Sequence, residues 1–183
     1  MYGLKPFAAL SSLLFSPATE HLKLNVTAVS ARDGRSTIEC WQLDQPFSWY
    51  PNGAFAASFH SLSSMTYTFV PRGYDTGSVN APRKQWAIVI AGLLHISLPH
   101  DNTTSAYIPA GENGIVFAAD TADISYTGHV SQFPGVTETV FLQFPTSDGG
   151  VPPHRELHMG PCKVHETSGL RGLSVDVSSS SLF

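Results

Sequence analysis

A histidine and an aspartate nine residues apart are the residues of this chain best suited to acid–base chemistry. His129 follows a glycine near the expected start of a strand, so a turn after Asp120 would bring the two side chains together. A carboxylate that accepts a hydrogen bond from one imidazole nitrogen fixes the tautomer and raises the basicity of the ring, as a general base near neutral pH requires. The alternative is a structural hydrogen bond at a corner of the fold.

Five further polar or aromatic residues are candidates for holding a substrate carbonyl or enol. His95 lies mid-strand among leucine and isoleucine residues, where it faces either a cavity or a core, and Gln85 offers a neutral amide. Tyr67 offers a hydroxyl from the middle of another strand, with a core aromatic as the alternative. Arg72 and Tyr74 follow that strand, where a guanidinium at the rim could hold an enol or carboxylate; a solvated loop charge is the alternative for Arg72.

The residues around Gln85 predict an apolar pocket. If Gln85 faces an interior, strand alternation puts Ala87 and Val89 beside it, and Gly114 and Val116 line the opposite wall. Nearly all of these positions are small, which leaves volume for a bulky apolar ligand held by a few polar groups. Filling of the same space by other side chains is the alternative.

Aromatic and histidine residues outside these strands give weaker signals. Trp49 and Tyr50 lie on a Pro/Gly loop and are interpreted as a lid that contacts substrate or as an interface patch. His154, His158 and His165 in the C-terminal segment are interpreted as surface histidines, because neighbouring prolines and a glycine leave little room for a helix.

β-strands are expected to position these side chains, because β-type runs separated by turn residues dominate the chain. Strands are expected over residues 22–29, 37–43, 54–60, 63–70, 85–91, 93–98, 105–108, 114–119, 126–130 and 137–144. We expect Gly92 to form a hairpin between two of them, and residues 71–77 to form a loop. The even spacing and the near absence of helical periodicity predict an all-β barrel or sandwich closed on itself.

The 183 residues are expected to form one domain. Residues 1–21 are predicted to be a short N-terminal helix or arm, residues 22–145 the barrel, and residues 146–183 an irregular tail that wraps the barrel or mediates a dimer. Charged residues make up 13% and the net charge is −4, which gives no footprint for nucleic acid. No stretch approaches the roughly 18 apolar residues of a membrane span.

Cysteine content and the N-terminal sequence bear on the compartment. The two cysteines, Cys40 and Cys162, are interpreted as independent buried thiols, with a single bridge from the tail to the barrel as the alternative. Residues 1–18 loosely imitate a secretory signal, and the triplets Asn25–Thr27 and Asn102–Thr104 fit the glycosylation acceptor pattern. A cytoplasmic location is favoured, because a proline interrupts the start and one positive charge precedes the apolar run; secretion remains the alternative.

Two motifs resemble those of small single-domain cupins of the type found in fungal natural-product pathways. The run Ala81–Trp86, an apolar strand and Gly92 resemble the first cupin motif, and Pro109–Gly111 before another apolar strand resembles the second. Residues 120–129 resemble a segment that follows the second motif. The similarity covers about residues 65–144 and implies a double-stranded β-barrel, or jelly roll.

The family's metal ligands are missing from both motifs. Where the first motif carries histidines and a glutamate, this chain has Ser78, Val79, Asn80, Ala81 and Gln85, and the histidine position of the second motif falls on Gly114. A first-row metal needs several imidazoles and a carboxylate that converge on one point. We therefore expect no metal or cofactor at the usual place, with relocated ligands such as His95 and His129 in a metal-dependent oxygenase as a further alternative.

The resemblance implies a role in secondary metabolism, and the missing metal ligands lead to the hypothesis of a metal-independent enzyme. The expected reaction is cyclisation, cycloaddition (as in a pericyclase), isomerisation or dehydration of an apolar polyketide- or terpenoid-like substrate in the barrel cavity. His129, His95, Tyr67 and Gln85 would donate to or accept from its carbonyl or enol, with Asp120 supporting His129. A non-enzymatic binding protein is the alternative, and the expected assembly is a homodimer.

Overall fold

Every regular element of the computed structural model is a β-strand, within the residues that the structure describes, 23–51 and 54–166. The strands are β1 (Lys23–Arg32), β2 (Arg35–Pro46), β3 (Ser48–Trp49), β4 (Phe55–Ala56), β5 (Thr66–Val70), β6 (Asp75–Val79), β7 (Gln85–Ala91), β8 (Leu93–Leu98), β9 (Asp101–Pro109), β10 (Ile115–Ala118), β11 (His129–Gln132), β12 (Thr139–Pro145) and β13 (His154–Met159). The chain is therefore all-β, as its sequence predicts. The predicted N-terminal helix of residues 1–21 lies outside the described residues.

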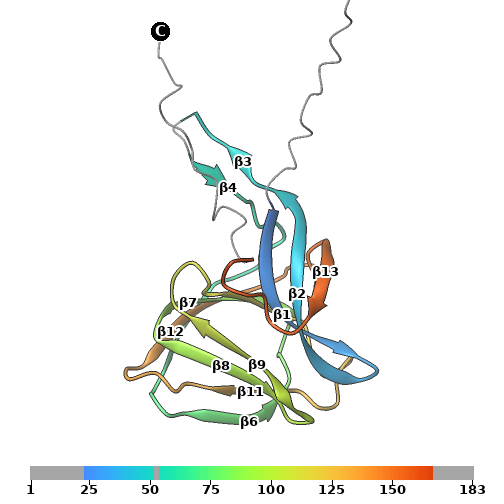
Figure 1. Ribbon diagram of the computed structural model, residues 1–183, viewed down its shortest axis with the longest axis vertical. Helices are drawn as coiled ribbons and strands as arrows, with labels where there is room; N and C mark the ends of the chain where they lie inside the picture. The colour runs from blue at the N-terminus through green and yellow to red at the C-terminus, as the bar shows by residue number, and fades with distance from the viewer. Residues whose placement is uncertain (1–22, 52–53, 167–183) are drawn as a thin grey trace, which may run out of the picture.

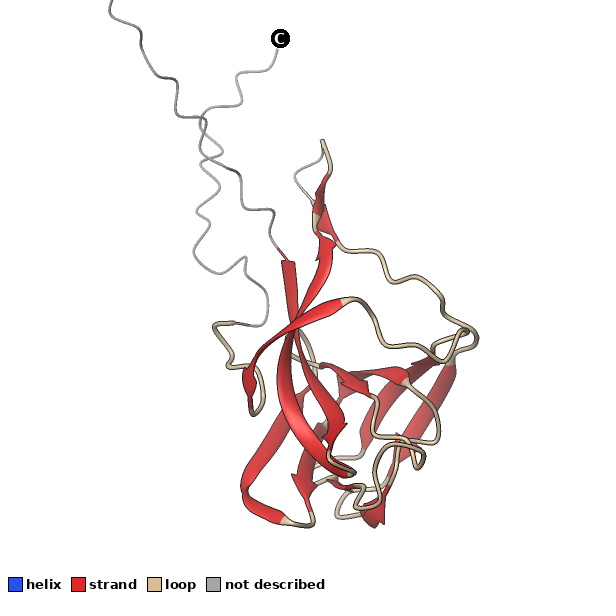
Figure 2. Ribbon diagram, turned by 90° about the vertical axis from the view of Figure 1, so that its right-hand side faces the viewer, coloured by secondary structure: helices blue, strands red, loops and turns tan. Residues whose placement is uncertain are grey.

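Two larger sheets and one strand pair contain these strands. A seven-stranded sheet has the order β13-β2-β1-β10-β7-β12-β5, and a four-stranded sheet has the order β6-β11-β8-β9. The short strands β3 and β4 pair only with each other. The four-stranded sheet lies low in the view of Figure 1, while β1 and β2 rise past it towards the β3–β4 pair; Figure 2 shows the strands from the side.

The long hairpin of β1 and β2 is closed by a two-residue turn. Asp33 and Gly34 both have positive φ, 50° and 76°, as the type I′ turns of tight hairpins require. The ring of Tyr126 packs over this turn, since a Cβ on Gly34 would lie 2.6 Å from Tyr126 Cε1. A side chain at position 34 would therefore displace the tyrosine.

Gly92 does not form the predicted hairpin. It joins β7 of the seven-stranded sheet to β8 of the four-stranded sheet, and the two strands do not pair. Its φ is +80°, and a Cβ there would lie 2.6 Å from the Glu138 carbonyl oxygen. Beside it, Leu93 N donates to Thr139 Oγ1 at 3.2 Å, and that hydroxyl donates to the Leu93 carbonyl at 3.1 Å. Gly92 thus lets the chain change sheets in close contact with β12.

Two predicted irregular segments contain strands. Residues 75–77 of the predicted loop, together with Ser78 and Val79, form β6, which pairs with β11. In the C-terminal segment, predicted to be irregular, residues 154–159 form β13 and pair with β2. β13 thereby satisfies backbone groups that would otherwise make β2 an open edge of the sheet.

Apolar residues pack on both faces of the seven-stranded sheet. The core between the two sheets includes Ala87, Val89 and Val116 from one and Leu94 and Ile96 from the other. The alternate residues of the seven-stranded sheet form a second core that includes Trp41, Trp86 and Phe117. Strand alternation in β7 therefore sends Gln85, Ala87 and Val89 between the sheets and Trp86 to the opposite face.

A disulfide joins Cys40 of β2 to Cys162, which follows β13, so the prediction of two independent thiols is wrong. The two Cα atoms are 4.6 Å apart and the cysteines are separated by 122 residues in sequence. Cys162 N also donates to Thr27 Oγ1 at 3.1 Å, and Asn25 Nδ2 donates to the Glu166 carbonyl at 2.7 Å. These contacts fix the end of the described chain against β1 and β2.

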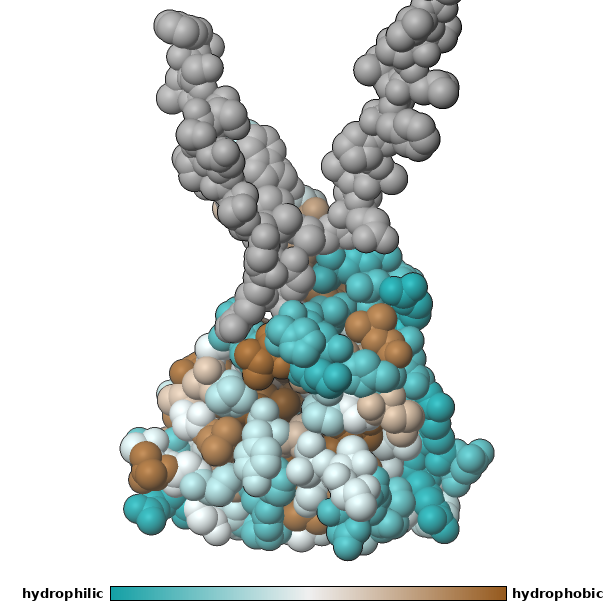
Figure 3. Space-filling view, in the orientation of Figure 1, coloured by the Kyte–Doolittle hydropathy of each residue, from teal (hydrophilic) through white to brown (hydrophobic). Residues whose placement is uncertain are grey.

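Two further findings concern the hydropathy of the surface and membrane-spanning helices. On the coloured part of the face shown in Figure 3, apolar side chains lie in separate spots among hydrophilic ones. Among the described residues, 23–51 and 54–166, no helix is long and apolar enough to cross a bilayer.

Candidate functional site

A cavity of about 190 Å³ lies between the two sheets. Its walls are mainly apolar and include Val29, Ala87 and Val116 from the seven-stranded sheet and Leu94 and Ile96 from the four-stranded sheet. The volume corresponds to roughly six water molecules at about 30 Å³ each. The space that the small residues around Gln85 were predicted to leave is therefore present, but it suits a small ligand and not a bulky one.

His129 and Asp120 form a buried hydrogen-bonded pair at this cavity. His129 Nδ1 donates to Asp120 Oδ2 at 2.8 Å, and the two side chains are 10% and 0% exposed. His129 lines the cavity, while Asp120 lies behind it. The turn predicted from the spacing of these residues thus brings the imidazole and the carboxylate together.

Local backbone geometry places both members of the pair. Asp120 follows β10, and Thr121 N donates to the Ala119 carbonyl at 2.7 Å in the turn that contains it. His129 begins β11 opposite Val79 of β6. The preceding Gly128 has φ +63°, and a Cβ on it would lie 2.5 Å from the Val79 carbonyl oxygen. Glycine is therefore required for the close approach that starts β11.

Hydroxyl and amide groups hold Asp120 in position. Ser36 Oγ donates to Asp120 Oδ2 at 2.6 Å and also hydrogen-bonds Ser125 Oγ at 2.8 Å. Asn80 Nδ2 donates to the backbone carbonyls of Asp120 and Ser125, both at 2.9 Å. The second carboxylate oxygen, Asp120 Oδ1, is buried without a partner among the described residues. The carboxylate is thus fixed in a buried setting, where its interaction with an imidazole is stronger than in water.

This arrangement determines which nitrogen of His129 is available for chemistry. Because Nδ1 carries the proton that Asp120 accepts, Nε2 has the lone pair in the neutral ring. Nε2 makes no hydrogen bond to a described residue. His129, which lines the cavity, therefore keeps one imidazole nitrogen able to accept a proton or a hydrogen bond.

Gln85 supplies a neutral polar group to the same cavity. Its side chain is 7% exposed, lines the cavity, and makes no hydrogen bond to a described residue. By contrast, Gln143, which also lines the cavity, accepts from Thr68 Oγ1 at 2.8 Å. The carboxamide of Gln85 is thus free to donate to a ligand oxygen.

His95, predicted as a cavity residue, lies on the other face of its strand. β8 alternates so that Leu94 and Ile96 are buried between the sheets and His95 points away from them. Its Nδ1 donates to Gln132 Oε1 at 2.9 Å, and its ring stacks on Tyr107 with centroids 4.2 Å apart. Of the two placements left open for His95, a cavity or a core, the cavity is excluded, because the neighbouring leucine and isoleucine occupy the inward positions.

Tyr67 also lies away from the cavity. It is 62% exposed on β5, the edge strand of the seven-stranded sheet, and Met65 and Phe69 share its exposure at 60% and 58%. Thr68 and Val70 take the less exposed positions of the strand. The predicted catalytic placement of Tyr67 is therefore wrong.

The residues predicted to contact substrate are divided between several places. Val116 lines the cavity, and Val89 is buried in the adjoining core without lining it. Arg72 donates from an exposed loop to the Val136 carbonyl at 3.4 Å, and Tyr74 is 54% exposed. Neither of these two residues lines the cavity.

The predicted aromatic lid lies elsewhere in the fold. Trp49 belongs to β3 and Tyr50 follows it, in the strand pair that projects away from the four-stranded sheet (Figure 1). Tyr50 N donates to the Ala54 carbonyl at 2.8 Å, which closes the turn of this pair. Tyr50 does not line the cavity, so its position gives no support to the lid interpretation.

The ligand positions of the cupin motifs do not form a metal centre. A Cβ at Gly114 would lie 2.7 Å from the Val89 carbonyl oxygen, so this backbone has no room for a histidine there. His95 and His129 lie on opposite sides of the four-stranded sheet, which rules them out as a shared ligand pair. Within the described residues, one group of side chains of the types that bind metals lies close together: Cys40, His158 and Glu166. The sulfur of Cys40 is bonded in the disulfide and is therefore not available as a thiolate ligand.

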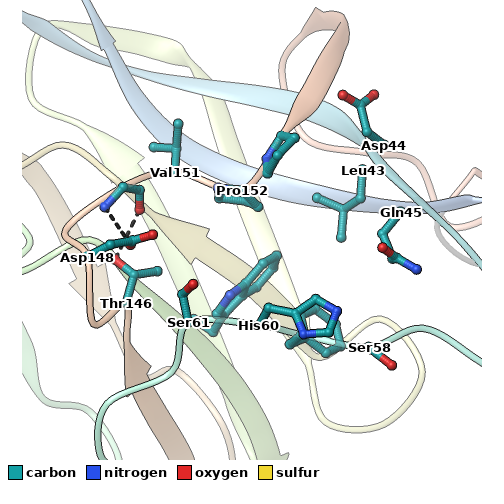
Figure 4. A pocket seen from close by; sticks show the side chains of 14 residues that line it. Leu43, Asp44, Gln45, Ser58, His60, Ser61, Thr146, Asp148, Val151 and Pro152 are labelled. Atoms are coloured by element: carbon teal, nitrogen blue, oxygen red, sulfur yellow. Dashed lines mark hydrogen bonds between the residues drawn. The ribbon is translucent and has the colours of Figure 1, made fainter.

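A second hollow, of about 400 Å³, lies on the opposite face of the seven-stranded sheet. Figure 4 shows side chains of β2, of residues 58–61 and of the loop 146–153 around it. Trp86 and Phe59 line it in an edge-to-face contact with centroids 4.8 Å apart, and His60 is exposed at its side. Sequence reasoning missed this groove, because loops with no regular pattern form most of its wall.

Comparison with known proteins assigns no family to the chain. A scan against protein-family models found no match, and a search of curated proteins found none. The resemblance of residues 65–144 to small cupins therefore remains a prediction, and the functional argument depends on the geometry of the cavity.

Proposed function

We propose that this protein is a metal-independent enzyme that moves a proton on a small, largely apolar carbonyl compound. The reaction is an isomerisation or a dehydration, and it takes place in the cavity between the two sheets. The observation that supports this most strongly is the His129–Asp120 pair, in which a carboxylate fixes the tautomer of an imidazole that lines an apolar hollow.

The chemistry follows from the two free polar groups. His129 Nε2 takes a proton from the carbon next to the carbonyl, the electron pair of that C–H bond forms a C=C bond, and the π pair of the carbonyl moves to its oxygen. The Gln85 amide donates to the resulting enolate oxygen, and the imidazolium returns the proton to a different carbon or to a departing hydroxyl group. Asp120 stabilises the imidazolium in between. A positioned base of this kind contributes roughly 10²–10⁴-fold to a rate.

The size of the cavity narrows the substrate class. Sites for drug-sized molecules usually measure about 300–1,000 Å³, whereas this cavity measures about 190 Å³. A cycloaddition of a bulky polyketide or terpenoid needs more room. A small cyclic or branched ketone, enone or hydroxyketone suits the volume and the apolar walls.

The finer predictions from the cupin resemblance remain part of this proposal. Two packed sheets with an interior polar cluster are compatible with a cupin-like jelly roll that serves natural-product metabolism. A homodimer is supported by exposed apolar side chains at the edge strand β5, namely Tyr67 and Phe69 in the strand and Met65 just before it.

The proposal is tested with cyclopentanone as the probe. In D₂O, abstraction and return of the α-proton replaces it with deuterium, which proton NMR follows as loss of the α-CH₂ signal. We expect the protein to accelerate this exchange above the buffer rate, and His129→Gln to abolish the acceleration. His95→Gln is the matched control, since the same substitution on the outer face of β8 should leave the rate unchanged.

Two outcomes would contradict the enzyme proposal. One is that cyclopentanone binds, as shown by shifts in the amide signals of cavity residues, but exchanges its α-protons only at the buffer rate. That result would indicate a carrier of small apolar molecules. The other is an equal loss of exchange in the His95 and His129 variants. Circular dichroism of each variant separates loss of chemistry from loss of fold.

A further inference from the structure

The disulfide indicates where this protein folds. Cys40 is fully buried and bonded to Cys162, and no cysteine is free. Structural disulfides form and persist in oxidising environments such as the secretory pathway and are rare in the cytosol. The bond therefore favours the secretory alternative over the cytoplasmic location that we expected from the sequence.

The N-terminal sequence agrees with passage through that pathway. Lys5 precedes an apolar run over residues 7–15, and the small residues Ser16 and Ala18 follow it. A positive start, an apolar stretch and small residues at a cleavage site make up a secretory signal. These residues lie outside the described part of the chain, so this point depends on the sequence alone.

The structure distinguishes the two glycosylation acceptor triplets. Asn25 is 9% exposed in β1, and its Nδ2 donates to the Glu166 carbonyl at 2.7 Å. A sugar on that nitrogen would have no room in the folded protein, because the nitrogen is buried against the Glu166 carbonyl. The triplet Asn25–Thr27 is therefore incompatible with glycosylation of the native molecule.

Asn102, in contrast to Asn25, is exposed and accessible for modification. It is exposed at the start of β9, immediately after the turn from β8, and its side chain makes no hydrogen bond to a described residue. The hydrogen bonds of the turn involve its neighbours: Thr103 N and Thr103 Oγ1 donate to Asp101 Oδ1 at 2.8 and 2.6 Å. A substituent on Asn102 Nδ2 would thus leave the turn intact.

We propose that Asn102 carries an N-linked glycan and that the protein is an exported glycoprotein. The Asn102 Nδ2 forms a bond to the anomeric carbon of an oligosaccharide carried on a polyisoprenyl diphosphate. The bond from that carbon to the diphosphate oxygen breaks, the lipid diphosphate leaves with the electron pair, and the nitrogen loses one proton. The Thr104 hydroxyl completes the acceptor triplet.

The position of the glycan has a physical consequence. β9 is an edge strand of the four-stranded sheet, so part of its backbone lacks a strand partner. Exposed edges can pair with other chains, and proteins protect them with bulky or charged groups. A glycan at the start of β9 would hinder such pairing, which makes this edge a suitable place for the modification.

The test uses the full chain expressed in a yeast host, with protein purified from the medium. Treatment with peptide N-glycosidase in ¹⁸O-labelled water converts a glycosylated asparagine to labelled aspartate, which peptide mass spectrometry locates. We expect the label at position 102 and an unmodified peptide around Asn25. Thr104→Ala should abolish the modification, and the matched variant Thr104→Ser should retain it.

Three results would overturn the proposal. They are secreted protein with an unmodified Asn102, label at Asn25 in folded protein, or a chain that stays inside the cell with both cysteines as free thiols. None of these results concerns the cavity, so failure here would leave the proposed proton transfer to its own test.

Discussion

Removal of the Cys40–Cys162 disulfide is expected to lower the free energy of unfolding by about 2–5 kcal/mol. The bond closes a loop that spans 122 residues in sequence. In the chain-entropy treatment, a loop of this size restricts the unfolded chain by roughly 5 kcal/mol at 25 °C, which is the upper end of the range. The main effect is therefore on the unfolded state.

The folded state should survive without the bond. β13 remains paired with β2, Gly160 N donates to the Ile38 carbonyl at 2.7 Å, and Asn25 still holds the Glu166 carbonyl. The double variant Cys40→Ala/Cys162→Ala should accordingly keep the circular dichroism spectrum of the oxidised protein. Its loss should be one of stability and not of fold.

Urea denaturation followed by tryptophan fluorescence measures this effect, because Trp41 and Trp86 are buried at 2% and 3% exposure. With an m-value of about 2 kcal/mol/M, the midpoint should fall by roughly 1–2.5 M. The reduced wild-type protein is the control for side-chain truncation. Equal midpoints for oxidised and reduced protein, or two titratable thiols in the purified unfolded chain, would refute the reasoning.

Two further predictions concern the turns. Gly92→Ala should destabilise the protein more than the control Gly73→Ala. The two glycines have similar φ values, +80° and +77°. A Cβ would meet backbone atoms within 2.7 Å at Gly92, whereas it would meet nothing within 4 Å at Gly73. Gly73→Ala should lower the free energy of unfolding by about 1–2 kcal/mol because of its left-handed backbone. Equal losses for the two variants in urea denaturation would contradict the close packing at Gly92. For Asp101, hydrogen bonds from Thr103 lower the pKa to about 2, below the unfolded value of about 3.9. The contribution of Asp101 to stability is therefore complete above pH about 3.9 and is lost as the pH falls through about 2; carboxyl NMR titration should show the low pKa, and Thr103→Val should raise it. An Asp101 that titrates at its ordinary value would contradict the turn geometry.

Sequence patterns within about ten residues correctly predicted one strand and one side-chain contact of the candidate site. Period-two alternation in residues 85–91 identified the strand and placed Gln85, Ala87 and Val89 on the same face. The spacing of Asp120 and His129 across a turn predicted their contact, since a short loop leaves few ways to arrange them. In both cases the decisive neighbours lie within ten residues along the chain.

Features that depend on distant parts of the chain were not predictable in this way. Alternation placed His95 and Tyr67 on a face of their strands, but the partner strands decide which face is buried. At His95, the apolar run of Leu94, Ile96 and Leu98 was the signal that marks the inward side. The disulfide and the role of Gly92 depend on contacts between segments far apart in sequence, which spacing alone does not reveal.

The central claim is that Asp120 fixes His129 so that a basic Nε2 faces a cavity open to small ligands. Nitrogen-15 NMR of the imidazole ring tests this most directly, because its two nitrogens report protonation separately. We predict that the neutral ring of His129 is protonated at Nδ1 and not at Nε2, that Asp120→Asn weakens this preference, and that cyclopentanone shifts the Nε2 signal. A neutral ring protonated at Nε2, or an Nε2 signal that does not respond to the ligand, would contradict the claim.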